Sequence, residues 1–280
     1  MKIGIIGATG WLGSALGSRL LSQGVVAPAD LAVLNRSGPR DDYFGHRGVI
    51  WARDVADLVA RSDVIVVSVR PQDWPALALS APGRLVISFM AGVPLDRIGR
   101  SGARVVRAMP NAAAETGNSY SPWFAGPGVT DADKQTVTRV LSAIGTSDEL
   151  TGEKQIDLMT ALPGSGSAYP ALMAVAMTEY MRGYGVPDHV AFKAVEAAVV
   201  DGAAMLAGRI DKAPEMVAAY VDYQGTTAAG IATAEASGFS AAIRAALDAA
   251  ADKARALGQD GPAENGPAGY GDGPAQDGRA

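Results

Sequence analysis

The N-terminal run MKIGIIGATGWLG limits the fold of this chain more than any other stretch. Lys2 to Ile6 is short and apolar, which is typical of a buried strand, and Gly7 follows it directly. From Trp11 onward apolar residues recur at helical spacing. In such a strand–turn–helix unit the glycines let the backbone approach a pyrophosphate, and the first amides of the helix point at it. The run therefore predicts a dinucleotide-binding site.

The spacing of the glycines departs from the commonest dinucleotide fingerprint. Thr9 stands where G-x-G-x-x-G has its second glycine, a variant also met in NADP-dependent reductases. A tight strand-to-helix turn with no ligand is the alternative interpretation, and the preceding strand makes it the weaker one. The residues expected to contact the cofactor here are Gly7, Thr9, Gly10, Trp11 and Leu12.

Composition excludes several classes of protein. The net charge is −5 and Lys and Arg form no cluster, which argues against nucleic acid and an anionic membrane surface as partners. There is no cysteine, and the two histidines are isolated, so we expect no metal site. The first strand begins at residue 2 and no apolar run is long enough to cross a bilayer, so a cytoplasmic protein is expected.

The first half of the chain alternates strands with helices, which predicts a Rossmann-like, doubly wound parallel sheet over residues 1–162. Strands are expected at 31–34, 63–69, 84–89 and 103–108. The last three deliver their loops to one edge of the sheet, where ligands bind in such folds. The cofactor contacts expected from these loops are Val69, Arg70, Pro71, Ala91, Met109 and Asn111.

The end of the second strand predicts which cofactor is used. An acidic residue near this point holds the ribose 2′-hydroxyl of NAD, whereas an arginine accommodates the 2′-phosphate of NADP. Asn35 takes that place here, and Arg36 and Ser37 follow with a guanidinium and a hydroxyl that suit a phosphate. We therefore expect NADPH rather than NADH. The alternative is that Arg36 is an ordinary solvated loop residue.

From Ala168 the pattern is helical only, with helices expected at 168–184, 187–208, 214–221 and 226–257. The second of these is apolar nearly all round and must be buried on several sides. One small helical domain, expected over 163–258, offers too little partner surface, so we predict a homodimer or a higher homo-oligomer. From Gln259 the chain consists largely of Gly, Pro, Ala and acidic residues, which predicts a disordered tail over 259–280.

Four motifs resemble those of the pyrroline-5-carboxylate reductases, in the order of that family. I-S-x-x-A-G-V is matched at 87–93 and R-x-M-P-N at 107–111. V-K-P-Q corresponds to V-R-P-Q at 69–72, and A-L-S-G-S-G-P-A-Y is similar to A-L-P-G-S-G-S-A-Y at 161–169. The resemblance covers roughly residues 1–258. It implies an NADPH-dependent reductase that converts 1-pyrroline-5-carboxylate, a small cyclic imine, to L-proline, with the substrate site built across an interlocked helical pair. It also implies substrate contacts at Met109, Pro110, Asn111, Gly164 and Ser165.

The family's substrate loop, S-P-G-G-T-T, corresponds to residues 222–227 here. Gly225, Thr226 and Thr227 match it, and the resemblance gives Thr227 the bond to the imine nitrogen. Backbone amides and the serine of that loop hold the substrate carboxylate in the family. The alternative for Thr227 is an ordinary helix N-cap.

Asp222, Tyr223 and Gln224 depart from that loop, and the first two bear on the chemistry. Two like charges ~4 Å apart at an effective dielectric of ~20 repel by about 4 kcal/mol, or roughly three decades in affinity. Either Asp222 turns away or is protonated, or the substrate has no carboxylate there and a cationic group is favoured. Tyr223 is a candidate proton donor to the nitrogen. A shifted loop with both side chains in solvent or in a subunit contact is the alternative.

Two functions from different classes follow. The first is an active imine reductase, acting on pyrroline-5-carboxylate or on a related imine without the carboxylate. The second is a non-catalytic relative that keeps the NADPH site as a binding subunit. Ser165 between two glycines and the paired Thr226 and Thr227 favour the first function, because an inactive site need not retain them.

Overall fold

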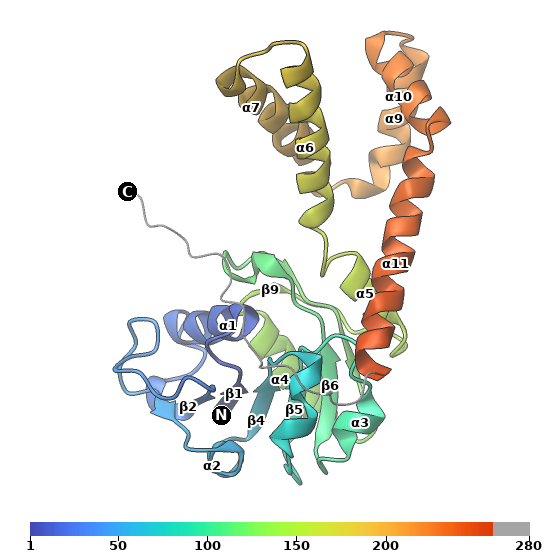
Figure 1. Ribbon diagram of the computed structural model, residues 1–280. Coiled ribbons are helices and arrows are strands. Elements are labelled where there is room, and N and C mark those ends of the chain that lie inside the picture. The colour runs from blue at the N-terminus through green and yellow to red at the C-terminus, as the bar shows by residue number, and fades with distance from the viewer. Residues whose placement is uncertain (260–280) are drawn as a thin grey trace. The chain divides into compact units, whose positions relative to one another are not determined.

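The computed structural model describes residues 1–259, and their contacts divide the chain into two compact units (Figure 1). Within the described residues, the first unit contains 1–164 and 250–259, and the second is Ser165–Ala249. The expected division, 1–162 and 163–258, assigned the whole last helix to the second domain. The contacts of the chain instead group the end of this helix, from Ala250, with the first unit. The expected tail lies outside the described residues apart from Gln259, which ends the last helix.

The first unit is built on a seven-stranded sheet of order β3-β2-β1-β4-β5-β6-β8. Its strands are β1 (Ile3–Ile6), β2 (Leu31–Leu34), β3 (Ile50–Trp51), β4 (Val64–Val67), β5 (Leu85–Ser88), β6 (Arg104–Ala108) and β8 (Trp123–Ala125). All neighbours are parallel except β8, which runs antiparallel to β6. A separate pair joins β7 (Ser119–Tyr120) to β9 (Gly145–Thr146). The predicted doubly wound sheet is confirmed, and the short edge strands β3 and β8 add to it.

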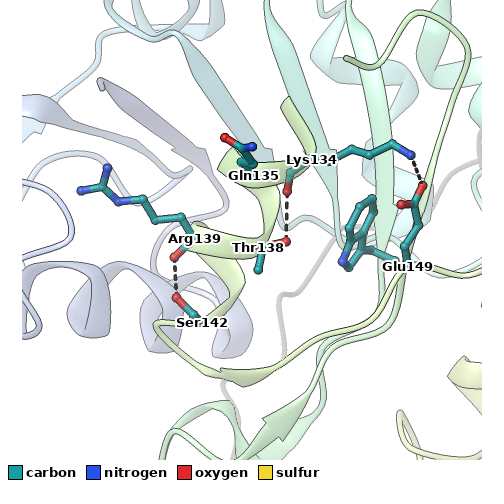
Figure 2. Close-up of a pocket in the computed structure, with 7 residues that line it drawn as sticks. Lys134, Gln135, Thr138, Arg139, Ser142 and Glu149 are labelled. Carbon is teal, nitrogen blue, oxygen red and sulfur yellow. Dashed lines mark hydrogen bonds and ion pairs between the residues drawn. The ribbon is translucent and has the colours of Figure 1, made fainter. Parts of the chain in front are cut away.

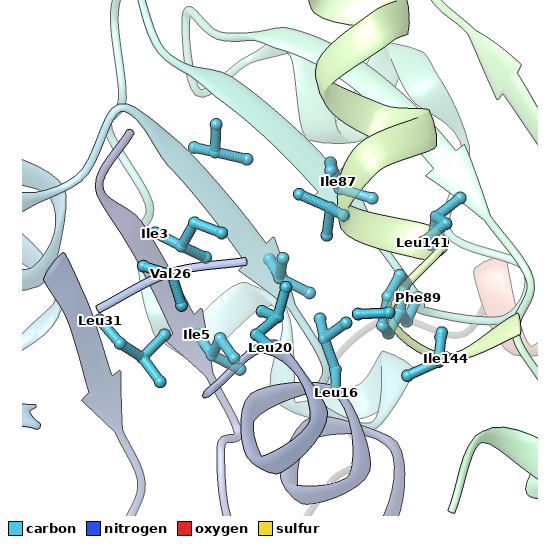
Figure 3. Close-up of a cluster of buried hydrophobic side chains, with 14 of the residues drawn as sticks. Ile3, Ile5, Leu16, Leu20, Val26, Leu31, Ile87, Phe89, Leu141 and Ile144 are labelled. Atoms are coloured by element: carbon cyan, nitrogen blue, oxygen red, sulfur yellow. The ribbon is translucent and has the colours of Figure 1, made fainter. Parts of the chain in front are cut away.

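Helices cover both faces of this sheet. Side chains of α1 (Trp11–Ser22) and α4 (Asp131–Leu141) share one buried cluster with alternate residues of β1 and β4 (Figure 3). The remaining residues of these strands pack in a second cluster with α2 (Val55–Arg61) and α3 (Leu95–Gly99). Successive strand residues point to opposite faces, so apolar residues throughout a strand fill both clusters.

Short 3₁₀ turns lie at Pro28–Asp30, Pro71–Asp73, Pro75–Leu77, Ala112–Ala114 and Ile210–Lys212.

Two further helical segments complete the first unit, α5 (Gln155–Ala161) and the end of α11 (Phe239–Gln259). The end of α11 lies directly on the turn after β5. A Cβ built on Gly92 would collide with the carbonyl oxygen of Ala254, and one on Gly258 would collide with that of Gly92. The two backbones therefore approach more closely than any side chain at either position would allow.

The second unit is helical. It contains α6 (Ala168–Gly183), α7 (Asp188–Glu196), a π-helical turn (Ala197–Asp201), α8 (Gly202–Ala204), α9 (Ala213–Asp222), α10 (Thr226–Ala236) and the first part of α11. The single helix expected over 226–257 is wrong, because Gly238 has φ +87 and separates α10 from α11. The helix expected over 187–208 stops at Ala204 and contains the π turn, which shifts the register of its buried face.

The second unit exposes large apolar side chains. Leu172 is 70% exposed, Ile210 71% and Tyr184 75% in the single chain. A surface of this kind is typical of a contact with another protein chain. No helix within residues 1–259 is both long and apolar enough to span a membrane.

Candidate cofactor and substrate site

The turn after β1 is shaped for close approach by a ligand. Gly7 has φ +83, and a Cβ there would collide with the carbonyl oxygen of Ser68. A Cβ on Gly13 would collide with the carbonyl oxygen of Gly7. Only glycine therefore allows β1, the turn and α1 to meet in this way, which brings the backbone of the turn to the surface.

Helix α1 begins without a side-chain cap. Its N-cap, Gly10, is extended at φ −73 and ψ 165, and within the described residues no side chain accepts the first N–H groups of the helix. Ser14 is the first residue whose N–H bonds back to Gly10, at 2.8 Å. The N–H groups of Trp11 and Leu12 thus stand at the positive end of the helix dipole, where an anion binds well.

Asn35 connects this turn with the end of β2. Its amide nitrogen donates to Thr9 Oγ1 at 3.1 Å and also to Ser37 Oγ. Its amide oxygen is buried and has no hydrogen-bond partner among residues 1–259. A buried acceptor without a partner is costly, so a ligand hydroxyl at this point would stabilise it. The glycine turn and Asn35 together fit the pyrophosphate and ribose of a dinucleotide.

The loops after β4 and β5 lie partly open. Val69, Arg70 and Pro71 are half-buried, and Arg70 Nε lies 3.1 Å from Asp73 Oδ2, which closes the 3₁₀ turn. Ala91 is half-buried in the turn that α11 covers. These residues can line a ligand without further movement of their strands.

The loop after β6 is more enclosed. Met109 and Pro110 are buried, whereas Asn111 is half-buried. The Asn111 side-chain oxygen accepts the N–H of Ala113 at 3.1 Å, and the backbone N–H of Asn111 donates to Ser119 Oγ at 3.0 Å. Met109 and Pro110 therefore pack inside the first unit and fix the course of the loop. Direct contact between them and a ligand stays a prediction.

Two residues that sequence reasoning passed over support these loops. Arg107, in the R-x-M-P-N motif, is 3% exposed and its guanidinium lies 2.9 Å from Glu153 and 3.4 Å from Asp157. Arg255 of α11 lies 4.0 Å from the same Asp157. The motif's arginine thus joins β6 to α5 and to the loop before it. The second residue, Tyr43, is buried and supports the glycine turn, because its hydroxyl donates to the Ala8 carbonyl oxygen.

The remaining residues predicted to contact the substrate lie at the end of the first unit and in the second unit. Gly164 ends the first unit, and a Cβ there would lie 2.6 Å from the Thr160 carbonyl oxygen. Ser165 begins the second unit.

Residues 222–227 form one turn of the second unit, between α9 and α10. Asp222 ends α9, Tyr223 is 85% exposed, and Gln224 has φ +54. Gly225 is the N-cap of α10 and no side chain within the described residues caps this helix, so an N-cap role for Thr227 is wrong. Thr226 and Thr227 are its first two residues, both exposed. The first amides of α10 thus have no side-chain cap, a geometry that suits an anion.

A hollow of about 470 Å³ lies elsewhere, against the outer side of α4 (Figure 2). Lys134 there is paired with Glu149 at 2.7 Å, and the hydroxyls of Thr138 and Ser142 donate to carbonyls of their own helix. Gln135, Arg139 and Trp123 complete its lining, which includes none of the predicted site residues. Four of its lining residues are bonded within the protein, whereas the buried indole nitrogen of Trp123 has no hydrogen-bond partner among residues 1–259.

Comparison with known proteins gives a consistent picture. The family described as "Pyrroline-5-carboxylate reductase dimerisation" matches residues 153–257, and "NADP oxidoreductase coenzyme F420-dependent" matches residues 2–92. The chain is 32% identical to the pyrroline-5-carboxylate reductase of Methanosarcina acetivorans over 270 residues, covering 92% of this chain and 98% of the relative.

Solved structures agree in fold. The pyrroline-5-carboxylate reductase of Coxiella burnetii superposes with a TM-score of 0.79 at 27% identity, covering 91% of this chain and 98% of that one. The pyrroline carboxylate reductase of Plasmodium falciparum, solved with NADP bound, superposes with a TM-score of 0.78 at 22% identity, covering 92% and 98%.

Proposed function

The chain belongs to the pyrroline-5-carboxylate reductase family, and from that membership we propose that it reduces 1-pyrroline-5-carboxylate to proline with NADPH. The observation that carries this proposal is similarity over nearly the full length of both chains, together with an uncapped, glycine-shaped helix start after β1. A cytoplasmic location stays a prediction from the sequence.

The cofactor would be held at both ends of its adenosine half. The N–H groups of Trp11 and Leu12 bind the pyrophosphate, and the buried Asn35 oxygen accepts a ribose hydroxyl. Arg36 and Ser37 are exposed beside Asn35 and suit a 2′-phosphate. When bound, NADPH supplies the hydride. The loops after β4, β5 and β6 line the nicotinamide side; the residues assigned there are Val69, Arg70, Pro71, Ala91, Met109 and Asn111.

Reduction of such a substrate needs few catalytic groups from the protein. The carbon of a protonated C=N bond is already electrophilic, so the side chains need to orient it and exclude water. We assign the substrate carboxylate to the uncapped start of α10, at Gly225 and Thr226, and the ring nitrogen to the hydroxyl of Thr227. Gly164 and Ser165 complete the assigned substrate contacts. Hydride addition to the carbon leaves the proton on the nitrogen, and Tyr223 is the assigned donor when the imine binds unprotonated.

The second unit supplies the contact between two copies of the chain. Its exposed apolar side chains need a partner surface, and the dimerisation family matches this part of the sequence. We assign the homodimer contact to these helices.

A second candidate substrate rests on one residue. Asp222 directly precedes the turn that is assigned to the substrate carboxylate. If its carboxylate faces the ligand, an imine without a carboxylate fits better, because a cationic iminium then meets the acid and no like charge opposes it.

The oxidation of NADPH with pyrroline-5-carboxylate and with 1-pyrroline, measured side by side, tests the proposal. Preference for pyrroline-5-carboxylate supports proline formation and places Asp222 away from the carboxylate; preference for 1-pyrroline supports the second candidate. No turnover with either substrate contradicts both and leaves the binding-subunit hypothesis. Thr227→Ala should lower kcat at least ~10-fold by removing the bond to the nitrogen, and unchanged turnover would show that its assigned role is wrong.

A further inference from the structure

The segment 36–42 is attached at both of its ends to the same glycine turn. We propose that the hydroxyl of Tyr43 is a positioning group for the cofactor, which holds this segment against the pyrophosphate turn and thereby sets the preference for a 2′-phosphate. The inference rests on the proposed NADPH site and adds to it a residue that touches no ligand.

The first attachment is made by Asn35, immediately before the segment. Its amide donates to Thr9 Oγ1 at 3.1 Å, so the end of β2 follows the position of the glycine turn. Within the segment, Arg36, Ser37 and Arg40 are all exposed. These are the groups of the segment that can meet a phosphate.

The second attachment is made by Tyr43, immediately after the segment. Its ring is 1% exposed, and its hydroxyl lies 2.8 Å from the Ala8 carbonyl oxygen and 3.2 Å from that of Gly13. Ala8 belongs to the pyrophosphate turn and Gly13 to the first turn of α1. One hydroxyl therefore joins the segment to the two backbone pieces that surround the proposed pyrophosphate position.

The backbone around Tyr43 is built to aim this ring. Tyr43 and His46 exchange both backbone hydrogen bonds at 3.0 Å, which closes a two-residue turn. Its central residues, Phe44 and Gly45, have φ of 51 and 82. Asp42 accepts the N–H of Gly45 at 2.9 Å. A positive φ at phenylalanine is strained, and such strain persists only where the surroundings fix the conformation.

The room for the hydroxyl is also fixed. A Cβ on Gly17 of α1 would collide with the Tyr43 hydroxyl, so only glycine leaves the ring in its place. Trp51 of β3 packs edge-on against the same ring with 6.0 Å between centroids. The ring thus cannot move away without opening the packing between α1 and β3.

This arrangement predicts an effect that depends on the cofactor. A segment held in place loses less entropy when its side chains bind a phosphate. NAD has no phosphate at this position and gains nothing from the segment. Loss of the hydroxyl should therefore weaken NADP binding and leave NAD binding nearly unchanged.

The experiment compares wild type and Tyr43→Phe in the full chain by calorimetric titration with NADP⁺ and with NAD⁺. We expect about five- to tenfold weaker binding of NADP⁺ and less than about twofold change for NAD⁺, with KM for NADPH raised and kcat unchanged. Equal weakening of both nucleotides would indicate a merely structural hydroxyl and would overturn the inference, as would no change in either.

Tyr120→Phe is the matched control, because it removes a hydroxyl that bonds to Asp148 in the same unit and should leave the NADP⁺/NAD⁺ affinity ratio unchanged. If Tyr43→Phe does not fold, Gly17→Ala provides the second test, since its methyl collides with both the hydroxyl and the ring of Tyr43, forces them to shift, and should lower the same ratio. A wild-type chain that binds NADP⁺ without reducing any imine contradicts the proposed function only. A wild-type chain that does not bind NADP⁺ overturns this inference.

Discussion

The two compact units treat apolar side chains in opposite ways. In the first unit the isoleucines and valines of β1 and β4 are all at most 4% exposed, between helices on both faces of the sheet. In the second unit the buried apolar residues on its helices are small or β-branched, such as Ala191 and Val195, while Leu172 and Tyr184 stand in solvent. The first unit therefore buries its sheet within one chain, although Trp11 and Phe44 at its surface are exposed, whereas the helices of the second unit require another chain to cover them.

The difference separates binding from assembly. The glycine turn, Asn35 and Tyr43 belong to the self-contained unit, whereas Thr226 and Thr227 belong to the unit that needs a partner. Cofactor affinity should then survive changes that abolish assembly, and assembly should survive changes that abolish cofactor binding.

The largest effect is expected from Leu172→Glu combined with Ile210→Glu in the second unit. Two charges on the exposed apolar surface cannot be buried against a partner without a large desolvation cost, so the dimer should dissociate and turnover should be lost. Sedimentation measures the assembly state and NADPH titration measures cofactor affinity, which should be unchanged. Phe44→Glu is the matched control on an exposed apolar residue of the first unit, 48% exposed, and should leave the dimer intact. A stable, active dimer in the double variant would contradict the comparison.

Gly7→Ala should have the next largest effect, confined to the first unit. The methyl group meets the Ser68 carbonyl oxygen and φ +83 is strained for alanine, so cofactor affinity should fall at least ~100-fold with the dimer unchanged. Gly24→Ala, at φ +66 with nothing within 4 Å of a Cβ, is the control for backbone strain alone. Comparable losses in both variants would show that strain, and not the close approach, sets the affinity.

A pair of similar ion pairs allows the stability of the two units to be compared. Arg104 binds Asp133 through two hydrogen bonds of 2.7 and 2.9 Å, and Arg182 binds Asp188 at 2.8 and 3.0 Å. The Asp133 side chain is 11% exposed and that of Asp188 59%. Asp133→Asn should lower the free energy of unfolding by about 2 kcal/mol, and Asp188→Asn by clearly less, because solvent screens the exposed pair.

The same pair predicts a pH dependence. The hydrogen bonds from Arg104 lower the pKa of the Asp133 carboxyl from 3.8 to about 2. Between these values the unfolded chain binds more protons than the folded one, so this stabilisation is complete above pH 3.8 and is lost as the pH falls toward 2. Thermal unfolding followed by circular dichroism between pH 5 and pH 2 should show a shallower decline for Asp133→Asn. An unchanged slope would contradict the assignment.

The smallest effect concerns cofactor choice. Arg36→Glu should oppose a 2′-phosphate and favour a ribose hydroxyl, which lowers the NADPH/NADH ratio of kcat/KM about tenfold or more. Sedimentation should be unchanged, because Arg36 lies outside the second unit. An unchanged ratio would show that Arg36 does not meet the 2′-phosphate.

The sequence predicts the elements whose signal is local. An unbroken apolar run such as Val64–Val67, or a glycine turn between a strand and a helix, is recognisable because neighbouring residues determine it. Tyr43 has no such signal, since its partners Ala8 and Gly13 are distant in the chain and are backbone carbonyls. Gly238 stands within an otherwise helical pattern, and its positive φ follows the end of α10 at Ala236.

Among the site residues, the cofactor turn was predictable because one continuous segment forms it. The buried state of Met109 and the pairing of Arg107 with Glu153 and Asp157 depend on which elements pack on β6. No local pattern encodes that packing.

The contact between Gly92 and Gly258 has a consequence for synthesis of the protein. A ribosome synthesises all strands of the sheet and then the whole second unit before it adds Gly258. Until then the turn after β5 lacks the helix end that covers it, and Asp157 lacks Arg255. The first unit, although its strands are complete early, can take its final form only after the chain has passed through the second unit and returned.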